Sequence, residues 1–305
     1  MDRLIDLIRA RKNPTVAGLD PKLEYIPKQI VDKQLQLHGE TLKAAAEAVF
    51  EFNAGLIDAL KDIVPAVKPQ SAYYERLGPD GVEVLRRTIA YAKEAGLYVI
   101  ADCKRNDIGS TAEAYAEAYL GSVTVGDKTY EPFGADSVTI NPYLGSDGIK
   151  PFYKFCTERE KTVFVLCKTS NPSSLELQDM IAGDRALYRV VAGYLERWGK
   201  DSVGKYGFSS IGAVVGATHP AQLKELRKLH PSLFFLVPGY GAQGGSAADI
   251  EYSFNREGHG AIVNSSRGIM CAWQKKGDDG THFAEAARDE AVAMRDALKQ
   301  YITIV

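Results

Sequence analysis

Eight short apolar runs, separated by segments with helical periodicity, constrain the fold of this chain more than any other feature. The runs are Thr15–Leu19, Ala66–Lys68, Tyr98–Cys103, Ser137–Ile140, Thr162–Cys167, Ile211–Val215, Phe234–Val237 and Ala261–Val263. A short apolar run is typical of a strand that is covered on both faces. Strands that alternate with helices form a parallel sheet through right-handed crossovers. Eight such units are the number that closes a β/α barrel.

The helical segments complete this pattern. After an opening helix, we expect helices at about 41–61, 79–95, 110–121, 146–159, 174–200, 219–229, 246–256 and 282–302. The first of these is rich in Ala, Leu and Glu, and it places Ala45, Val49, Phe52 and Leu56 on one face. The spacing predicts an α/β fold, a (β/α)8 TIM barrel, with an open doubly wound sheet as the alternative architecture.

The chain is longer than a barrel requires. A typical β/α barrel needs about 250 residues, and this chain has 305. The surplus is predicted to lie in three extended loops, at 20–40, 122–135 and 171–185. No linker rich in Pro, Gly or Ser divides the sequence, so we expect a single barrel domain over 1–305.

Composition and charge exclude several classes of protein. The chain is 45% hydrophobic and 25% charged, as ordinary globular proteins are, and its net charge is −2. That balance argues against a nucleic-acid partner. No apolar run approaches the roughly 18 residues of a membrane span, and no signal-peptide pattern opens the chain. We therefore expect a cytoplasmic protein without a membrane partner.

Cysteine and histidine usage gives no sign of a metal site. The four cysteines show no C-x-x-C spacing, which favours reduced thiols in the core. The five histidines are scattered, and none belongs to an H-E-x-x-H helix. We expect no catalytic metal.

Polar residues follow the apolar runs at every predicted strand end. They are Asp20, Lys68 with Gln70, Asp102 with Lys104, Asn141, Thr169 with Ser170, Thr218 with His219, Gln243, and Ser265 with Arg267. One polar strand end means little, because turns favour Asp, Asn and Ser. In a closed barrel, however, all eight ends meet at one rim, where that fold keeps its chemistry.

The densest charge lies in VIADCKRNDIGSTA, from Val99 to Ala112. A buried strand here runs directly into Asp102, Lys104 and Asp107, with Arg105 between them. Burying an unpaired charge costs on the order of several kcal/mol, so these groups are expected to face a cleft. Alternation places Asp102 and Lys104 on one face of the strand. The alternative is an ion pair that only caps the strand.

A candidate anion site follows the last two strands. The segment PGYGAQGGS runs from Pro238 to Ser246, and NSSRG ends with Arg267 and Gly268. Glycines allow backbone amides to approach an anion, and a guanidinium adds a bidentate charge. Barrels commonly bind phosphate with these two loops. The alternatives are a plain glycine turn and a dinucleotide motif, and the second is disfavoured because no acid follows the next strand.

The motif DCKRNDIGSTA resembles the D-x-K-x-x-D-I-x-x-T signature of the orotidine 5′-monophosphate decarboxylase family. GLDP, VKPQ, KTSNP, PGYGAQGG and NSSRG match that family at other strand ends, and the chain is most similar to its longer bacterial form, type 2. Related enzymes that share D-x-K-x-x-D generally hold magnesium with further acids. Lys68 stands where such an acid is expected, which favours the cofactor-free decarboxylase.

The resemblance implies a role for each matching residue. Lys104, Asp102, Asp107 and Lys68 would form the catalytic network, and the substrate would contact Asp20, Ile108, Thr111, Ser170, Pro238, Gln243, Gly244, Ser266 and Arg267. In this set, Ser170 would hold the pyrimidine, Gln243 would bridge base and phosphate, and Arg267 with the glycine amides would hold the phosphate. Asp107, Ile108 and Thr111 would reach into a partner's site, which implies a homodimer with shared sites.

The implied reaction converts orotidine 5′-monophosphate to UMP and CO2, the last step of de novo pyrimidine synthesis. Lys104 would protonate the carbanion left at C6, within the charge network of Asp102 and Asp107. Two alternatives remain open. A lysine at a barrel strand end also suits a Schiff-base aldolase, and a barrel that binds a nucleotide without converting it is the third possibility.

Overall fold

Eight parallel strands form a closed barrel in the computed structural model, which describes residues 1–241 and 244–305. In order around the barrel, the strands are β1 (Thr15–Leu19), β2 (Ala66–Pro69), β3 (Tyr98–Arg105), β6 (Ser137–Ile140), β7 (Thr162–Lys168), β10 (Ile211–Val215), β11 (Phe235–Val237) and β12 (Ala261–Ser265). Each of the eight predicted runs overlaps one of them, and β2, β3, β7 and β12 extend past the predicted ends. The prediction of a β/α barrel is confirmed, and the open sheet is excluded.

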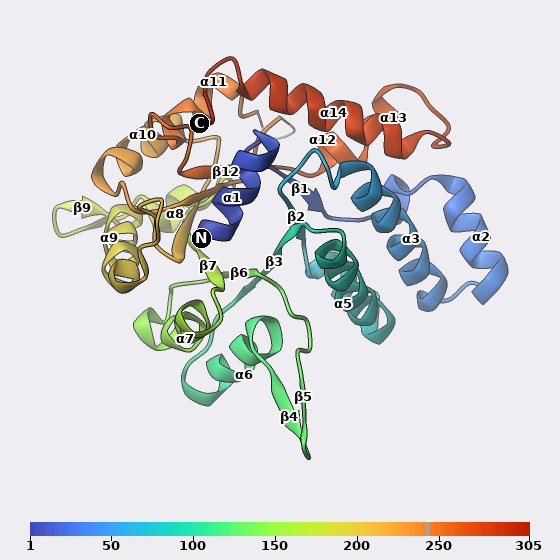
Figure 1. The fold of residues 1–305 in the computed structure, drawn as a ribbon, viewed down its shortest axis with the longest axis horizontal. Coiled ribbons are helices and arrows are strands. Elements are labelled where there is room, and N and C mark those ends of the chain that lie inside the picture. Colours follow the sequence, from blue (N-terminus) through green and yellow to red (C-terminus); the bar gives the residue numbers. More distant parts are fainter. Residues whose placement is uncertain (242–243) are drawn as a thin grey trace.

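Helices surround this barrel (Figure 1). They are α1 (Asp2–Arg11), α2 (Lys28–His38), α3 (Leu42–Leu60), α4 (Ala72–Glu75), α5 (Gly78–Glu94), α6 (Gly109–Leu120), α7 (Lys150–Glu158), α8 (Ser174–Gln178), α9 (Leu187–Gly199), α10 (Pro220–Leu229), α11 (Ala247–Ile250), α12 (Arg267–Met270), α13 (Ala272–Lys275) and α14 (Phe283–Leu298). Short 3-10 helices occupy η1 (Leu23–Tyr25), η2 (Gly145–Gly148), η3 (Lys200–Ser202) and η4 (Glu251–Ser253).

Two of the sequence predictions on helices are wrong. The single helix expected at 174–200 is divided into α8 and α9 by a hairpin of β8 (Ile181–Ala182) and β9 (Arg185–Ala186). Gly183 takes a left-handed φ of 71° in its turn, which breaks the helix. The helix expected at 246–256 is only α11 followed by η4.

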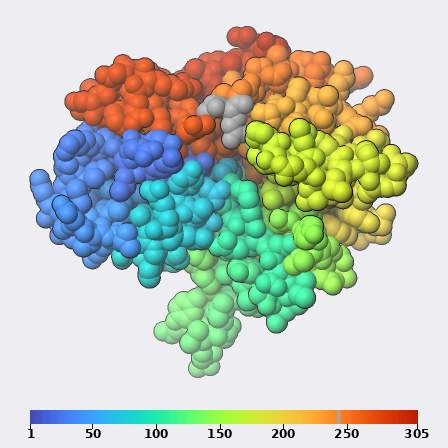
Figure 2. Space-filling view, turned by 180° about the vertical axis from the view of Figure 1, so that it is seen from behind, coloured from blue at the N-terminus to red at the C-terminus, as the bar shows by residue number. Residues whose placement is uncertain are grey.

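The predicted loops also contain regular structure. The segment 20–40 includes η1 and α2. The segment 122–135 forms an antiparallel hairpin of β4 (Val123–Val125) and β5 (Lys128–Tyr130), whose strand residues are all exposed. This hairpin projects away from the barrel in both views of the molecule (Figures 1 and 2).

The amino-terminal end of the barrel is packed shut. Leu4, Ile5 and Ile8 of α1 belong to the same buried cluster as the barrel side chains Phe164 and Phe234. Apolar side chains thus fill the barrel interior at this end, whereas the opposite end, where the strands finish, holds a cavity among the described residues.

Cysteine use agrees with the sequence. All four cysteines are unpaired and buried, and burial raises the pKa of the Cys103, Cys156 and Cys167 thiols to about 12. These thiols therefore pack as small apolar groups. Within the part of the chain that the structure describes, no helix has both the length and the apolar character needed to cross a membrane.

Candidate active site

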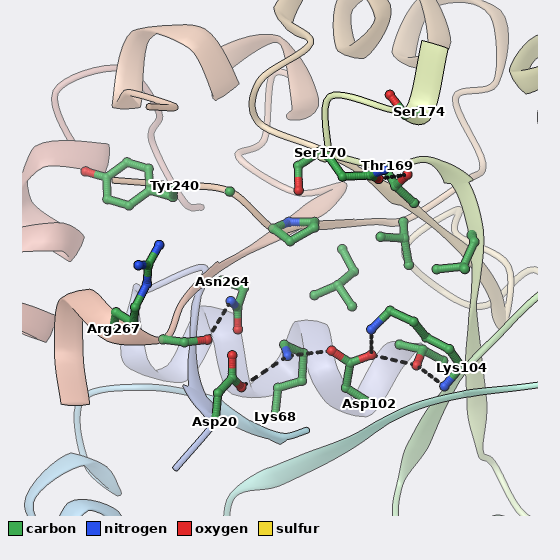
Figure 3. Close-up of a pocket in the computed structure, with 18 of the residues that line it drawn as sticks. Asp20, Lys68, Asp102, Lys104, Thr169, Ser170, Ser174, Tyr240, Asn264 and Arg267 are labelled. Atoms are coloured by element: carbon green, nitrogen blue, oxygen red, sulfur yellow. Dashed lines mark hydrogen bonds and ion pairs between the residues drawn. The ribbon is translucent and has the colours of Figure 1, made fainter. Parts of the chain in front are cut away.

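A cavity of about 690 Å³ opens at the carboxyl ends of the barrel strands. Its floor is apolar, formed by Leu166, Val214 and Leu236. Its walls are polar and include Asp20, Lys68, Tyr73, Asp102, Lys104, Thr139, Thr169, Ser170, Ser174, Gln178, Pro238, Gly239, Tyr240, Asn264, Ser266 and Arg267. Figure 3 shows how the charged side chains converge on this space. Such a cavity can take a ligand with a flat apolar part and charged ends.

Asp102 lies at the centre of a charge network between two lysines. Its Oδ2 accepts hydrogen bonds from Lys68 Nζ at 2.7 Å and from Gln70 Nε2 at 3.1 Å. Its Oδ1 accepts from Lys104 Nζ at 2.6 Å and from the Thr139 hydroxyl at 2.8 Å. Four hydrogen bonds therefore fix this buried carboxylate in one orientation, and Figure 3 marks those from Lys68 and Lys104.

The network holds Asp102 and Lys68 in the charged state. Burial would raise the pKa of Asp102, but the charges of Lys68 and Lys104 and their hydrogen bonds outweigh burial and hold it well below the usual value. Burial would likewise lower the pKa of Lys68, but Asp102 and Asp20 hold it above its usual value. Asp20 Oδ1 lies 3.8 Å from Lys68 Nζ. The pair is thus a carboxylate and an ammonium at neutral pH.

Lys104 differs from Lys68 in exposure and in backbone. Its side chain is 44% exposed, whereas that of Lys68 is 5% exposed. Its φ of 49° lies in the left-handed region, which costs a residue with a Cβ roughly 1 kcal/mol or more. The pairing of β3 with β6 is irregular between Ala101 and Arg105, where Lys104 lies. The predicted alternation holds, because Cys103 is buried and its thiol contacts the Thr139 carbonyl oxygen instead.

The structure of one chain does not bring Asp107, Ile108 and Thr111 into the cavity. Asp107 Oδ1 accepts the Ile108 backbone N–H at 2.8 Å, just before α6. Ile108 is 55% exposed, and Thr111 is exposed in the first turn of α6. Among the described residues, Asp102 is the acid that pairs with Lys104. The expectation that Asp107 flanks Lys104 from the following turn is therefore not met within a single chain.

The candidate phosphate end is only partly described. Pro238, Ser266 and Arg267 line the cavity, and Arg267 is the first residue of α12. Gly244 is described but is not part of the lining, and Gln243 lies outside the described residues. A Cβ on Gly18 of β1 would meet Ser266 Oγ at 1.9 Å, so only a glycine at position 18 leaves room for this serine.

Ser170 is held in the cavity wall by its neighbours in the loop after β7. Thr169 N–H donates to Gln178 Oε1 at 2.8 Å, and Gln178 Nε2 donates to the Thr169 hydroxyl at 2.8 Å. The buried Lys168 bonds to Asp179 Oδ2 at 2.9 Å. These contacts fold α8 back over the end of β7.

Two strand-end residues that were expected at the rim, Asn141 and His219, line neighbouring pockets rather than the main cavity.

Several cavity residues were not predicted from the sequence. Thr139 takes the inward place on β6, and the alternation of Ser137 and Thr139 with buried apolar residues was the available signal. Tyr240 and Asn264 lie inside the two segments predicted to bind an anion, but neither was singled out as a site residue.

Two oxygen atoms of the lining have unmet hydrogen-bonding capacity. Asp20 Oδ1 and Asn264 Oδ1 are buried, and neither has a hydrogen-bond partner among the described residues. A buried acceptor without a donor is costly, so a ligand with hydroxyl or amide donors would be stabilised here. Over residues 1–241 and 244–305, no group of three or more His, Cys, Asp or Glu side chains is arranged to hold a metal ion.

The fold and the site together define a class: a β/α-barrel enzyme whose strand ends hold a buried network of lysines and acids. The model of the Orotidine 5′-phosphate decarboxylase / HUMPS family matches residues 39–277. The chain belongs to this family.

Individual relatives agree with that assignment. The chain is 44% identical to the orotidine 5′-phosphate decarboxylase of Rhodopirellula baltica over 289 residues, which are 93% of this chain and 94% of that protein. It is 42% identical to that of Clostridium perfringens over 99% of this chain and 98% of the relative. Among solved structures, a putative orotidine-monophosphate-decarboxylase from Toxoplasma gondii superposes with a TM-score of 0.77 at 31% identity, covering 98% of both chains.

Proposed function

We propose that this chain decarboxylates orotidine 5′-monophosphate to UMP and CO2 without a cofactor. The observation that carries the proposal is the Lys68–Asp102–Lys104 network at the barrel mouth, with one amine buried and the other open to the cavity. Family membership and the names of the relatives support the same reaction. Substrates of this kind have a flat base, a ribose and a phosphate, which suits the apolar floor and polar walls.

Lys104 is the general acid in this mechanism. When the bond from C6 to the carboxylate breaks, its electron pair stays on C6, where no neighbouring carbonyl can delocalise it. The Lys104 ammonium stabilises that charge and donates its proton to C6, which releases UMP and CO2. The amine then regains a proton from water, since its side chain is 44% exposed.

The other residues orient the substrate. Asp102 holds the Lys104 amine at 2.6 Å and lies near the departing carboxylate. Asp20 and Lys68 bind the ribose, a role supported by the unmet acceptor on Asp20. Ser170 binds the pyrimidine.

The phosphate is assigned to the loops after β11 and β12. This part of the site consists of Arg267, Ser266, Pro238, Gln243 and Gly244. The first three line the cavity, which supports their assignment. The phosphate is remote from the reacting carbon C6, but its binding energy orients the base. A substrate without phosphate should therefore lose turnover as well as affinity.

The assembly we propose is a homodimer with shared sites. Asp107, Ile108 and Thr111 of one chain complete the partner's site. The support is that none of them lines the cavity of their own chain, and that Ile108 and Thr111 are exposed. Mixing Lys104→Ala chains with Asp107→Ala chains should restore part of the activity, because some hybrid sites then contain both intact residues. No recovery after verified subunit exchange would contradict the shared site.

We also propose that residues 1–305 form one catalytic domain in the cytoplasm. The larger of two buried clusters includes residues from Ala17 to Ile302, which supports the first part. Four unpaired cysteines support a reducing compartment.

The direct test of the reaction is the absorbance change of orotidine 5′-monophosphate on incubation with the purified protein and a metal chelator. Consumption with release of UMP and CO2 is expected. Tight binding of UMP without consumption would instead establish a binding protein. Irreversible labelling of Lys104 or Lys68 by borohydride and a carbonyl compound would favour the aldolase.

A further inference from the structure

We propose that Thr139 is a positioning residue, whose hydroxyl fixes the Lys104 backbone and the Asp102 carboxylate in one arrangement. The inference rests on the proposed function, because the position of the Lys104 amine matters for catalysis only if that amine acts on the substrate. Thr139 lies in β6, on the strand next to the charged motif, and it belongs to none of the motifs that identified the family.

The contacts of the Thr139 hydroxyl form a closed ring. Its Oγ1 accepts the backbone N–H of Lys104 at 3.0 Å and donates to Asp102 Oδ1 at 2.8 Å. The same Oδ1 accepts from Lys104 Nζ at 2.6 Å. A hydroxyl has one proton to donate and lone pairs to accept with, so these contacts use it in a fixed direction. Both ends of Lys104 are thereby connected to one carboxylate oxygen, the backbone N–H through the Thr139 hydroxyl and Nζ directly.

The backbone of Lys104 explains why such a connection is needed. Its left-handed φ of 49° is unfavourable for a residue with a Cβ and persists only when the surroundings hold it. The regular pairing of β3 with β6 is interrupted between Ala101 and Arg105. Inside that interruption the Thr139 hydroxyl bonds to the Lys104 N–H. The side chain of β6 thus stabilises the local geometry that directs the amine into the cavity.

Burial makes this arrangement rigid. Thr139 is 1% exposed, and Asp102 is buried beside it. Water therefore does not replace the hydroxyl without a rearrangement, and the loss of the methyl group alone should leave both bonds in place. This predicts opposite behaviour for serine and valine at position 139, although valine keeps the volume of threonine.

The chain offers a matched control at the closed end of the same barrel. Thr162 lies at the start of β7, is fully buried, and its hydroxyl is 2.8 Å from the Tyr98 hydroxyl. Thr162→Val removes a buried barrel hydroxyl with its hydrogen bond, as Thr139→Val does, but far from Lys104. Any general cost of placing valine in a barrel strand should affect both variants.

The experiment measures kcat and KM for orotidine 5′-monophosphate and Kd for UMP, with thermal unfolding for each variant. In Thr139→Val, kcat should fall tenfold or more, since small displacements of a catalytic group cost up to about 100-fold, while KM and Kd stay within threefold. Thr139→Ser should retain kcat within threefold. Thr162→Val should lower Tm with kcat unchanged. If Thr139→Val does not fold, Thr139→Ala is measured instead, and its kcat should fall by the same tenfold or more.

A decrease in kcat of less than tenfold in Thr139→Val or Thr139→Ala would overturn the proposal, and so would an equal loss in Thr139→Ser. Crystal structures of the variants decide the positioning independently of turnover. The Lys104 φ should leave the left-handed region in Thr139→Val and remain there in Thr139→Ser, and an unmoved Lys104 in Thr139→Val would overturn the inference. If the wild-type protein does not consume orotidine 5′-monophosphate, the proposed function fails while this structural comparison still stands.

Discussion

The two ends of the barrel use the same eight strands in opposite ways. At the amino-terminal end, the interior is filled by rings such as Phe164 and Phe234, and α1 covers them with Leu4 and Ile5. At the carboxyl end, the inward positions on β2 and β3 carry charges, and the interior opens into a cavity. One end contributes stability through apolar burial, and the other places charged groups where a ligand can reach them.

The difference extends to the backbone. At the closed end, β3 pairs with β6 in regular register, as in Ile100 with Ser137. At the open end, that register is interrupted, the pairing of β7 with β10 shifts beside Val215, and Lys104 is left-handed. The two interruptions of strand pairing lie at the open end, whereas left-handed residues occur at both ends, since Lys12 and Glu160 precede β1 and β7. Irregular pairing therefore coincides with the place where ligand chemistry occurs, and the regularly paired end supports it. Substitutions at the open end should therefore affect turnover, and those at the closed end should affect stability.

The largest effect is expected for Lys104→Ala. Removing the proton donor and the cation at C6 should lower kcat by roughly 10⁴-fold or more, because the two contributions are each typically worth 10²-fold or more. The variant should bind UMP as the wild type does and unfold at a similar temperature, since the side chain is 44% exposed. Steady-state kinetics and UMP titration measure both quantities. Turnover near the wild-type rate would refute the mechanism.

Asp102→Asn should affect stability as well as turnover. The substitution leaves the Lys68 ammonium buried without its main carboxylate, and breaking a buried pair in this way costs about 3–5 kcal/mol. Chemical denaturation measures the free energy of unfolding. The double variant Lys68→Met with Asp102→Asn should recover part of the loss, because no buried charge then lacks a partner. A double variant less stable than Asp102→Asn would contradict this explanation.

The same pair sets a pH window. The pKa of Asp102 is lowered, so its contribution to stability is present above the unfolded pKa of about 3.9 and is lost as pH falls through the lower folded pKa. The pKa of Lys68 is raised, so its contribution is present below about 10.4 and is lost as pH rises through the higher folded pKa. The stability difference between wild type and Asp102→Asn should be constant near neutral pH and should shrink in acid.

The regular parts of the molecule could be predicted from the sequence. Eight apolar runs gave the eight barrel strands, because buried strands must be apolar along their whole length. The motif around Asp102 and Lys104 identified the network, because charges directly after a buried strand need partners. The hairpin at Gly183 and the helix Lys28–His38 were missed, because short surface elements depend on turn geometry and on packing against the barrel.

Contacts between strands far apart in the sequence could not be predicted. Thr139 meets Lys104 only because β6 lies beside β3 with an irregular register, and no local pattern in the sequence encodes that shift. The position of Asp179 beside Lys168 likewise depends on how α8 folds back. Pairwise geometry of this kind requires the structure, even when each strand is found correctly.

The closed end should respond to substitution in the opposite sense. Leu4→Ala should lower the free energy of unfolding by about 2–4 kcal/mol, because it leaves a cavity in the cluster that covers the barrel. The values of kcat and KM should not change at a temperature where the variant is folded. Denaturation curves and kinetics on the same preparation measure both effects. A tenfold loss of kcat without unfolding would show that the two ends are coupled.

The smallest effect is expected for Asp179→Asn, which sharpens the comparison because it alters a charge pair that holds a wall of the cavity, between the buried Lys168 and an acid that is 29% exposed. Lys168 Nζ bonds to Asp179 Oδ2 at 2.9 Å and to Ser174 Oγ at 3.3 Å, so the amide should weaken the attachment of α8. KM should rise about three- to tenfold, which corresponds to about 0.6–1.4 kcal/mol, with kcat nearly unchanged. Val125→Ser, in the exposed hairpin, is the control and should change neither parameter. A fall in kcat at constant KM would assign the Lys168–Asp179 pair to the chemical step instead of to substrate binding.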